Sequence, residues 1–109
     1  MGTFTAGAIV LVRFPFSDLT RSKLRPAVVL AEIDNNDVIL CQITSKPYAD
    51  ENAIDLSKDS FAQGSLNRIS YVRPGKIFTA SSKIIVRQVA KLKPSVRQTI
   101  VDSIITIIQ

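Results

Sequence analysis

The sequence contains no histidine and no tryptophan, and it has a single cysteine, Cys41. Without histidine, the chain lacks the commonest general base and metal ligand of enzymes, and every Ser–His or Cys–His dyad. One cysteine excludes an intrachain disulfide and any zinc site built from several cysteines. Any catalysis must therefore come from arginine, lysine, carboxylates, hydroxyl groups or the backbone.

Long hydrophobic runs are also missing. The longest apolar run, residues 8–12, is far too short to cross a bilayer. Residues 1–8 lack the basic region and long apolar stretch of a signal peptide. We therefore expect a cytoplasmic protein that has no membrane partner and keeps Cys41 reduced.

Positive charge, by contrast, is in excess. The chain has 14 lysine and arginine residues against 9 acidic ones, a formal net charge of +5. This balance favours an anionic partner, with nucleic acid ahead of an acidic protein or a membrane surface. An ordinary basic surface is the alternative. The length of 109 residues indicates one domain, residues 1–109, with one modest core.

Short β-branched segments separated by turn residues predict a mainly β fold. Residues 34–37 (DNND) predict a hairpin turn, Gly64 interrupts the chain, and Pro74-Gly75 predicts a turn. Residues 16–24 and 45–52 are expected loops. The predicted strands are residues 8–14 (ended by Pro15), 26–33, 38–44, 53–56, 67–73, 76–79 and 83–89.

The C-terminal residues change to helical periodicity. From Val96 onward the apolar residues fall within one half of a helical projection. Pro94 suits the start of a helix, and residues 95–98 (SVRQ) resemble a capping box. A strand over residues 104–108 is the alternative. Several short strands and a terminal helix predict a small, closed or nearly closed β-barrel with the helix packed on it.

Two polar residues stand out on the predicted strands. Alternation along residues 38–44 puts Ile39, Cys41 and Ile43 on one apolar face, which we expect to be the core face. Thr44 then lies on the more polar face, at the strand's end. Arg25 precedes Pro26, which restricts it to extended geometry at the start of a strand, and its guanidinium suits phosphate. A solvated loop charge is the alternative for Arg25.

Three blocks of the sequence resemble the PemK/MazF toxins of toxin–antitoxin systems. They are GAIVLVRFPF at residues 7–16, SKLRPAVVL at residues 22–30 and VILCQITSK at residues 38–46. The Arg-Pro pair before an apolar strand, followed by a strand that ends Ile-Thr-Ser, is typical of that family. Residues 64–77, which include SYVR, are similar to a later family segment.

This resemblance implies a fold, an activity and partners. The fold would be the SH3-like barrel shared with CcdB, with a terminal helix. The activity would be metal-independent, sequence-selective cleavage of single-stranded RNA by a homodimer, with no cofactor. Arg25 and Thr44 fall on the family's catalytic positions. A cognate acidic antitoxin would block the RNA groove, and the complex would bind DNA.

The chemistry implied is attack of the RNA 2′-hydroxyl on its own phosphorus, which leaves a 2′,3′-cyclic phosphate. Arg25 and Thr44 would stabilise the developing charge, whereas the proton acceptor stays open between Asp18 and solvent. Phe14 and Phe16 are candidates for stacking on bases. Loops 16–24 and 45–52 would select the sequence that is cleaved. The remaining candidate RNA contacts are Ser17, Arg21, Lys23, Ser45, Lys46, Arg68, Ser70, Arg73 and Lys76.

Two other functions are compatible with this fold. One is a CcdB-like gyrase poison, which acts by binding a protein. The Trp-containing tail of CcdB-type chains is absent here, because the sequence ends Ile107-Ile108-Gln109. The other is an inactive RNA-binding or regulatory relative, since an Arg25–Thr44 pair is necessary for activity but not sufficient.

Overall fold

The computed structural model describes residues 4–15, 22–46 and 50–109. Within these residues the chain forms seven strands, three short 3₁₀ turns and one α-helix. The strands are β1 (Ala8–Pro15), β2 (Ser22–Ile33), β3 (Asp37–Thr44), β4 (Ile54–Leu56), β5 (Phe61–Gly64), β6 (Ser70–Ser81) and β7 (Ile85–Leu92). The helix is α1 (Pro94–Ile108), and the 3₁₀ turns are Asp34–Asn36, Lys58–Ser60 and Ser82–Ile84.

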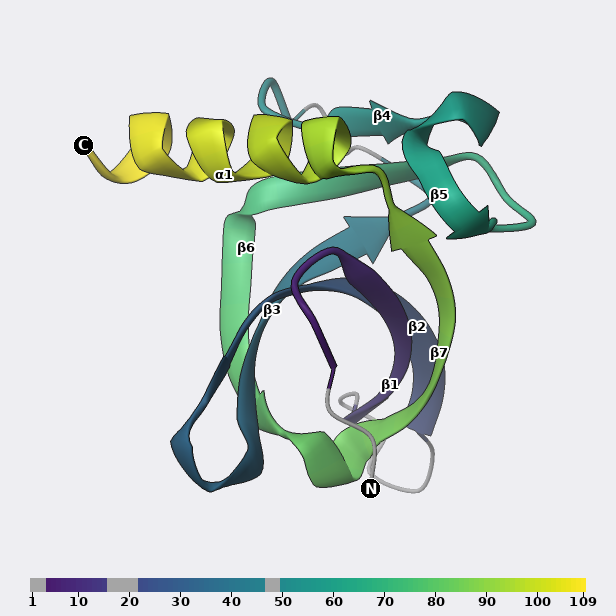
Figure 1. Cartoon of the computed structure of the whole chain (residues 1–109), viewed down its shortest axis with the longest axis vertical. Coiled ribbons are helices and arrows are strands. Elements are labelled where there is room, and N and C mark those ends of the chain that lie inside the picture. The colour runs from purple at the N-terminus through teal and green to yellow at the C-terminus, as the bar shows by residue number, and fades with distance from the viewer. Residues whose placement is uncertain (1–3, 16–21, 47–49) are drawn as a thin grey trace.

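All the strands belong to one antiparallel sheet with the order β4-β6-β3-β2-β1-β7-β5. The sheet curls into an incomplete barrel, and α1 lies across one end of it (Figure 1). This confirms the expected small barrel with a terminal helix. No helix among the described residues is long and apolar enough to cross a membrane.

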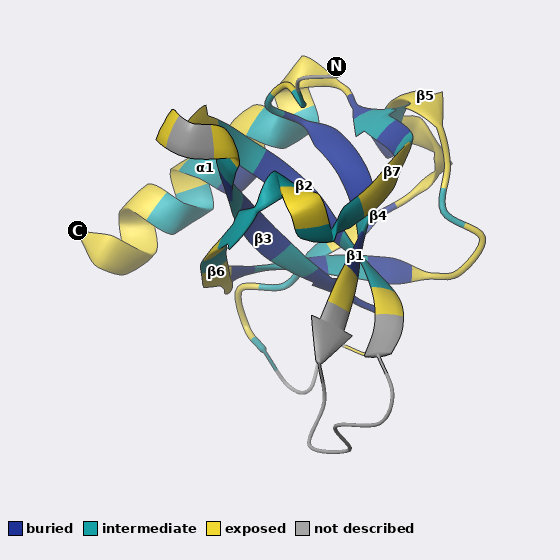
Figure 2. Ribbon diagram, turned by 90° about the horizontal axis from the view of Figure 1, so that it is seen from below, coloured by how far each residue is buried: buried dark blue, intermediate teal, exposed yellow. Residues whose placement is uncertain are grey.

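Both faces of the central strands are buried. One cluster contains Ile9, Val28, Cys41 and Ile43 together with Ile100 of α1. Their neighbours along the same strands alternate to the opposite face and form a second cluster, which includes Val10, Val29, Val38 and Leu40. Dark blue therefore dominates these strands in Figure 2. The face that carries Val38, Leu40 and Thr44, predicted to be the more polar of the two, is therefore buried as well, because curling of the sheet encloses both of its faces.

Strand β2 begins earlier than expected. It starts at Ser22 rather than Pro26, and Arg25 pairs with Val12 of β1. Arg25 therefore lies inside a strand and not at its start, because the β1–β2 ladder continues beyond the apolar residues. The predicted turn at residues 34–37 is confirmed, and Asn36 there has a φ of +67°.

Strand β6 runs through Pro74-Gly75, where the sequence had predicted a turn. Pro74 and Gly75 lie in an irregular bulge, in which residues 73–76 of β6 are opposite the single residue Gln42 of β3. Proline fits a bulge, where no ladder hydrogen bond is required from its nitrogen. The Cys41 thiol donates to the Arg73 carbonyl oxygen at 3.1 Å. The prediction of two strands was therefore wrong, and β6 bends sharply instead (Figure 1).

Two other strand predictions differ from the structure. Strand β5 was missed, and Gly64 is its last residue, with a φ of +66°. Strand β7 begins at Ile85 rather than residue 83 because Ser82–Ile84 form a 3₁₀ turn. The short edge strand β4 is confirmed.

The helix is confirmed, but its predicted cap is wrong. Lys93 is the N-cap residue and makes no side-chain cap, and the backbone N–H groups of Val96 and Arg97 donate to its carbonyl oxygen. Pro94 starts the helix, so Ser95 is already inside the first turn. The Gln98 side chain donates to Asp102 at 2.8 Å instead. The alternative strand over residues 104–108 is wrong.

Candidate functional site

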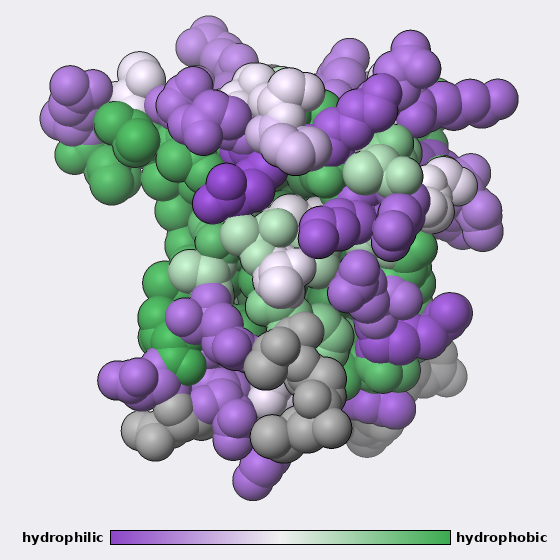
Figure 3. Space-filling view, in the orientation of Figure 1, coloured by the Kyte–Doolittle hydropathy of each residue, from purple (hydrophilic) through white to green (hydrophobic). Residues whose placement is uncertain are grey.

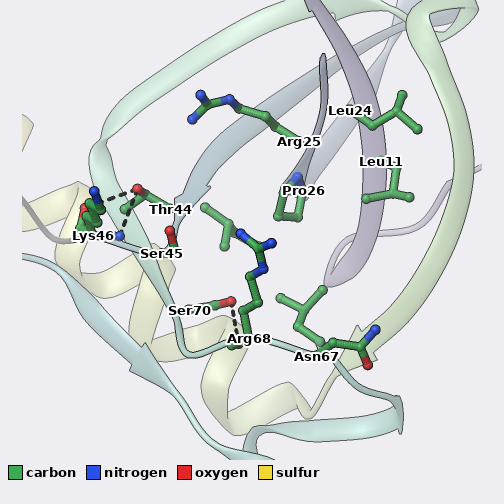
Figure 4. A pocket seen from close by; sticks show the side chains of 12 residues that line it. Leu11, Leu24, Arg25, Pro26, Thr44, Ser45, Lys46, Asn67, Arg68 and Ser70 are labelled. Carbon is green, nitrogen blue, oxygen red and sulfur yellow. Dashed lines mark hydrogen bonds between the residues drawn. The ribbon is translucent and has the colours of Figure 1, made fainter.

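One pocket of about 500 Å³ gathers the main candidate residues. It opens beside β1, β2, the end of β3 and the segment that leads into β6 (Figure 4). Its volume lies within the usual range for small-ligand sites. Its lining residues are Leu11, Leu24, Arg25, Pro26, Ile43, Thr44, Ser45, Lys46, Leu66, Asn67, Arg68 and Ser70.

Arg25 and Thr44 are brought together from neighbouring strands. Ala27 of β2 pairs with Gln42 of β3, so the start of β2 runs beside the end of β3. Arg25 is half-buried, and its side chain extends toward the side of the pocket where Thr44 lies (Figure 4). The two candidate catalytic residues therefore share one cavity.

Thr44 is a buried residue whose hydroxyl is already used locally. Only 6% of it is exposed. Its Oγ1 accepts a hydrogen bond from the Lys46 backbone N–H at 3.1 Å and donates to the Lys46 carbonyl oxygen at 3.0 Å. Such a local turn fixes the backbone that follows the strand. Ser45 and Lys46 are thereby held at the rim, where both are exposed.

Ser70, at the start of β6, and Arg68, in the segment before it, also line the pocket. Ser70 is 6% exposed, and its hydroxyl donates to the Arg68 carbonyl oxygen at 2.9 Å. The Arg68 guanidinium rises toward the middle of the pocket, between Pro26 and Thr44 (Figure 4). Ser70 therefore holds the backbone that carries a cationic group into the cavity.

The pocket is electrostatically suited to an anion. Three of its described lining residues are cations, namely Arg25, Lys46 and Arg68, and none is a carboxylate. Three more carry hydroxyl groups, which can donate to an oxyanion. Charge-assisted hydrogen bonds from guanidinium and ammonium groups to phosphate oxygens are shorter and stronger than neutral ones. The described part of the chain contains no cluster of acidic, His or Cys residues that could hold a metal ion.

Arg73 and Lys76, two predicted RNA contacts, do not line this pocket. The Arg73 Nε donates to the Asp50 carboxylate at 2.9 Å. This hydrogen bond, together with one from the Asn52 backbone N–H, holds the pKa of Asp50 below its usual value. Alternation along β6 explains the separation, since Ser70 and Val72 are buried whereas Arg73 faces the other way.

Several other predicted residues lie outside the described part of the chain. These are Ser17, Arg21, Asp18 and Phe16, together with the side chains of Lys23 and Phe14. Cys41 agrees with its expected role as a small core residue. It is fully buried, and burial raises the pKa of its thiol to about 12.

Sequence reasoning missed four lining residues: Leu11, Leu24, Leu66 and Asn67. Nothing in their local sequence marks them as functional. They meet because the curl of the sheet brings the segment between β5 and β6 beside β1 and β2. Only a predicted contact between these distant segments would have revealed them.

Comparison with known proteins gives one family. A model of the PemK-like, MazF-like toxin of type II toxin–antitoxin systems matches residues 5–108. None of the curated proteins compared with the chain matches it.

Solved structures give the same fold. MazE–MazF from Deinococcus radiodurans has a TM-score of 0.76 at 17% identity, over 94% of each chain. An endoribonuclease in complex with its cognate antitoxin from a mycobacterial species has a TM-score of 0.72 at 13% identity, over 99% of this chain and 95% of that one. The Mycobacterium tuberculosis toxin MazF-mt6 has a TM-score of 0.69 at 18% identity, over 89% and 91%. At these identities the likeness concerns the fold alone.

Proposed function

We propose that this chain, which belongs to the PemK-like, MazF-like toxins of type II toxin–antitoxin systems, is a metal-independent endoribonuclease that cleaves single-stranded RNA at selected sequences. The observation that supports the proposal is that Arg25 and Thr44 line one pocket whose described charged residues are all cations. One similar solved structure is itself described as an endoribonuclease bound to its antitoxin.

The reaction needs no external nucleophile. The 2′-hydroxyl oxygen forms a bond to the adjacent phosphorus while the bond from phosphorus to the 5′-oxygen breaks. The products are a 2′,3′-cyclic phosphate and a 5′-hydroxyl, so the proton lost by the 2′-oxygen is balanced by one gained at the 5′-oxygen. Because nucleophile and phosphorus belong to the same molecule, positioning supplies much of the acceleration.

Arg25 and Thr44 act on the phosphate in this mechanism. The cationic guanidinium of Arg25 stabilises negative charge on the phosphoryl oxygens. The Thr44 hydroxyl, now donating to the Lys46 carbonyl oxygen, rotates to donate to the bound phosphate. Asp18 or solvent accepts the proton.

The exposed cations extend the RNA site beyond the reacting phosphate. Lys46 and Arg68 bind flanking phosphates, and Ser45 donates from the rim. Ser70 is a positioning residue, because its hydroxyl holds the Arg68 backbone. Ser17 and Arg21, which lie outside the described residues, and Lys23, which lies in β2, remain proposed RNA contacts. Arg73 and Lys76 would contact RNA only outside this pocket.

The proposed partners are a second copy of the chain and an acidic antitoxin. Apolar side chains lie exposed on β6 and the end of α1, where Ile77, Ile105 and Ile108 are 40%, 49% and 74% exposed. Figure 3 shows apolar surface along this side of the molecule. Exposed apolar residues of this kind favour a protein–protein contact. The cationic pocket suits the carboxylates of an antitoxin that competes with RNA.

The test is RNA cleavage in EDTA. Purified protein should cut single-stranded RNA and leave cyclic phosphate and 5′-hydroxyl ends, detected by end-specific labelling. Arg25→Ala and Thr44→Ala should each lower the rate by about 10²–10³ and relieve growth arrest. Arg87→Ala and Thr79→Ala, which change exposed residues outside the pocket, are the matched controls.

Four results would contradict the proposal. A strict requirement for magnesium would exclude the mechanism, and full activity of a folded Arg25→Ala variant would remove that residue from the site. Growth arrest without RNA cleavage would favour the gyrase-poison alternative. If the protein causes neither growth arrest nor RNA cleavage, an inactive relative is favoured.

A further inference from the structure

We propose that the apolar side of the same pocket holds the nucleobase next to the scissile phosphate, and that Asn67 selects this base. The inference rests on the proposed function. It shifts part of the sequence selectivity from the loops expected at residues 16–24 and 45–52 to the segment between β5 and β6.

The pocket is divided by polarity. Thr44, Ser45 and Lys46 lie on one side of it, and Leu11 and Leu24 lie on the other (Figure 4). Leu66 and Asn67 also line the pocket. A nucleotide has the same division, with a charged phosphate joined through its sugar to a base that has apolar faces. With phosphate at the cationic side, the attached base falls against the leucines.

The leucines that line the pocket leave part of their apolar surface open to solvent. Leu24 is 47% exposed on β2, and Leu11 and Leu66 are partly buried. Binding sites for small ligands combine apolar walls of this kind with a few polar groups that fix orientation. A base covering these side chains removes their surface from water, which favours its binding.

Asn67 supplies the polar group at this side. It is the one carboxamide among the described lining residues, and it is exposed. A carboxamide offers a donor and an acceptor side by side, and it pairs most characteristically with adenine. Bases of single-stranded RNA are read in this way along their exposed edges. We therefore assign adenine as the preferred base.

The segment that carries Asn67 is held at both ends. The buried Ser70 hydroxyl binds the Arg68 carbonyl oxygen at 2.9 Å. At the other end, Gly64 packs so closely on β7 that a Cβ there would lie 2.4 Å from the Val89 carbonyl oxygen. A preformed backbone is what precise base selection requires.

The experiment maps cleavage sites on total RNA in EDTA for the wild type, Asn67→Asp and Leu24→Ala. Asn67→Asp keeps the side-chain shape but replaces the donor with an acceptor. Asn36→Asp makes the same change at an exposed residue of the turn between β2 and β3, outside the pocket, and Ile33→Ala, at a residue 43% exposed on β2, is the control for Leu24→Ala.

In the wild type, adenine should be enriched at one position beside the cut. Asn67→Asp should reduce that preference on the order of tenfold and leave the other positions unchanged. Leu24→Ala should lower kcat/KM on adenine-containing sites by about tenfold. Both controls should give the wild-type pattern.

Base frequencies that stay unchanged in Asn67→Asp and Leu24→Ala would overturn the inference, even if cleavage itself is normal. The inference would also be overturned if the variants keep the wild-type base frequencies but are no longer inhibited by the antitoxin, because these side chains would then bind a protein and not a base. A wild type that cuts no RNA would overturn the proposed function as well, which separates the two failures.

Discussion

Replacement of Gly64 by alanine should destabilise the protein strongly. Gly64 has a φ of +66°, and an added Cβ would lie 2.4 Å from the Val89 carbonyl oxygen and 3.0 Å from the Ala90 Cα. Both atoms belong to the backbone of β7, so they cannot move aside without disturbing the β5–β7 ladder. The left-handed conformation alone costs a non-glycine residue about 1–2 kcal/mol.

The close contact adds to that cost. Overpacking of a well-packed site costs about 1–3 kcal/mol, whereas the lower entropy of the unfolded alanine chain returns at most about 1 kcal/mol. We expect the free energy of unfolding to fall by about 2–4 kcal/mol, a large share of the usual 5–15 kcal/mol. Urea denaturation at fixed protein concentration, followed by circular dichroism, measures this change.

Gly75→Ala is the matched control. Nothing lies within 4 Å of a Cβ added at Gly75, and its φ is not positive. The same substitution should therefore change the free energy of unfolding by less than about 1 kcal/mol. Equal urea midpoints for Gly64→Ala and Gly75→Ala would refute this reasoning, because the left-handed backbone and the close contact at Gly64 would then have no effect on stability.

Three other results are expected. Ile100→Ala should lower the free energy of unfolding by about 2–5 kcal/mol in urea, because Ile100 is fully buried, whereas Ile108→Ala, at a residue 74% exposed, should change it little. The Cys41 thiol, buried and with its pKa raised to about 12, should resist a thiol reagent at pH 8 until urea unfolds the chain; rapid native labelling would contradict its burial. The pKa of Asp50 is lowered mainly by its hydrogen bond from Arg73. The contribution of Asp50 to stability should therefore be complete above pH about 4 and be lost as the pH falls through the folded-state pKa. Asp50→Asn should weaken this acid dependence of the thermal midpoint, and an unchanged pH profile would contradict the prediction.

Most of the strands, and the C-terminal helix, could be predicted from the local sequence. The β-branched runs, the turn at residues 34–37 and the periodicity after Pro94 each reflect interactions between residues close in the chain. The errors occurred where distant strands decide the outcome. Pro74-Gly75 has strong turn chemistry, yet pairing of β6 with β3 on both sides converts it into a bulge. Strand β5 is short, and it exists because β7 pairs with it.

The candidate site divides in the same way. The sequence by itself placed Arg25 before a proline and Thr44 at a strand end, beside Ser45 and Lys46, because these are relations between neighbours in the chain. Only the tertiary structure decided that Arg68 shares their pocket while Arg73 binds Asp50 on the other side of β6. It also decided that leucines from β1, β2 and the segment before β6 form one apolar wall. The physical reason is the pairing and curling of the sheet, which fix side-chain direction and proximity through hydrogen bonds between strands far apart in sequence.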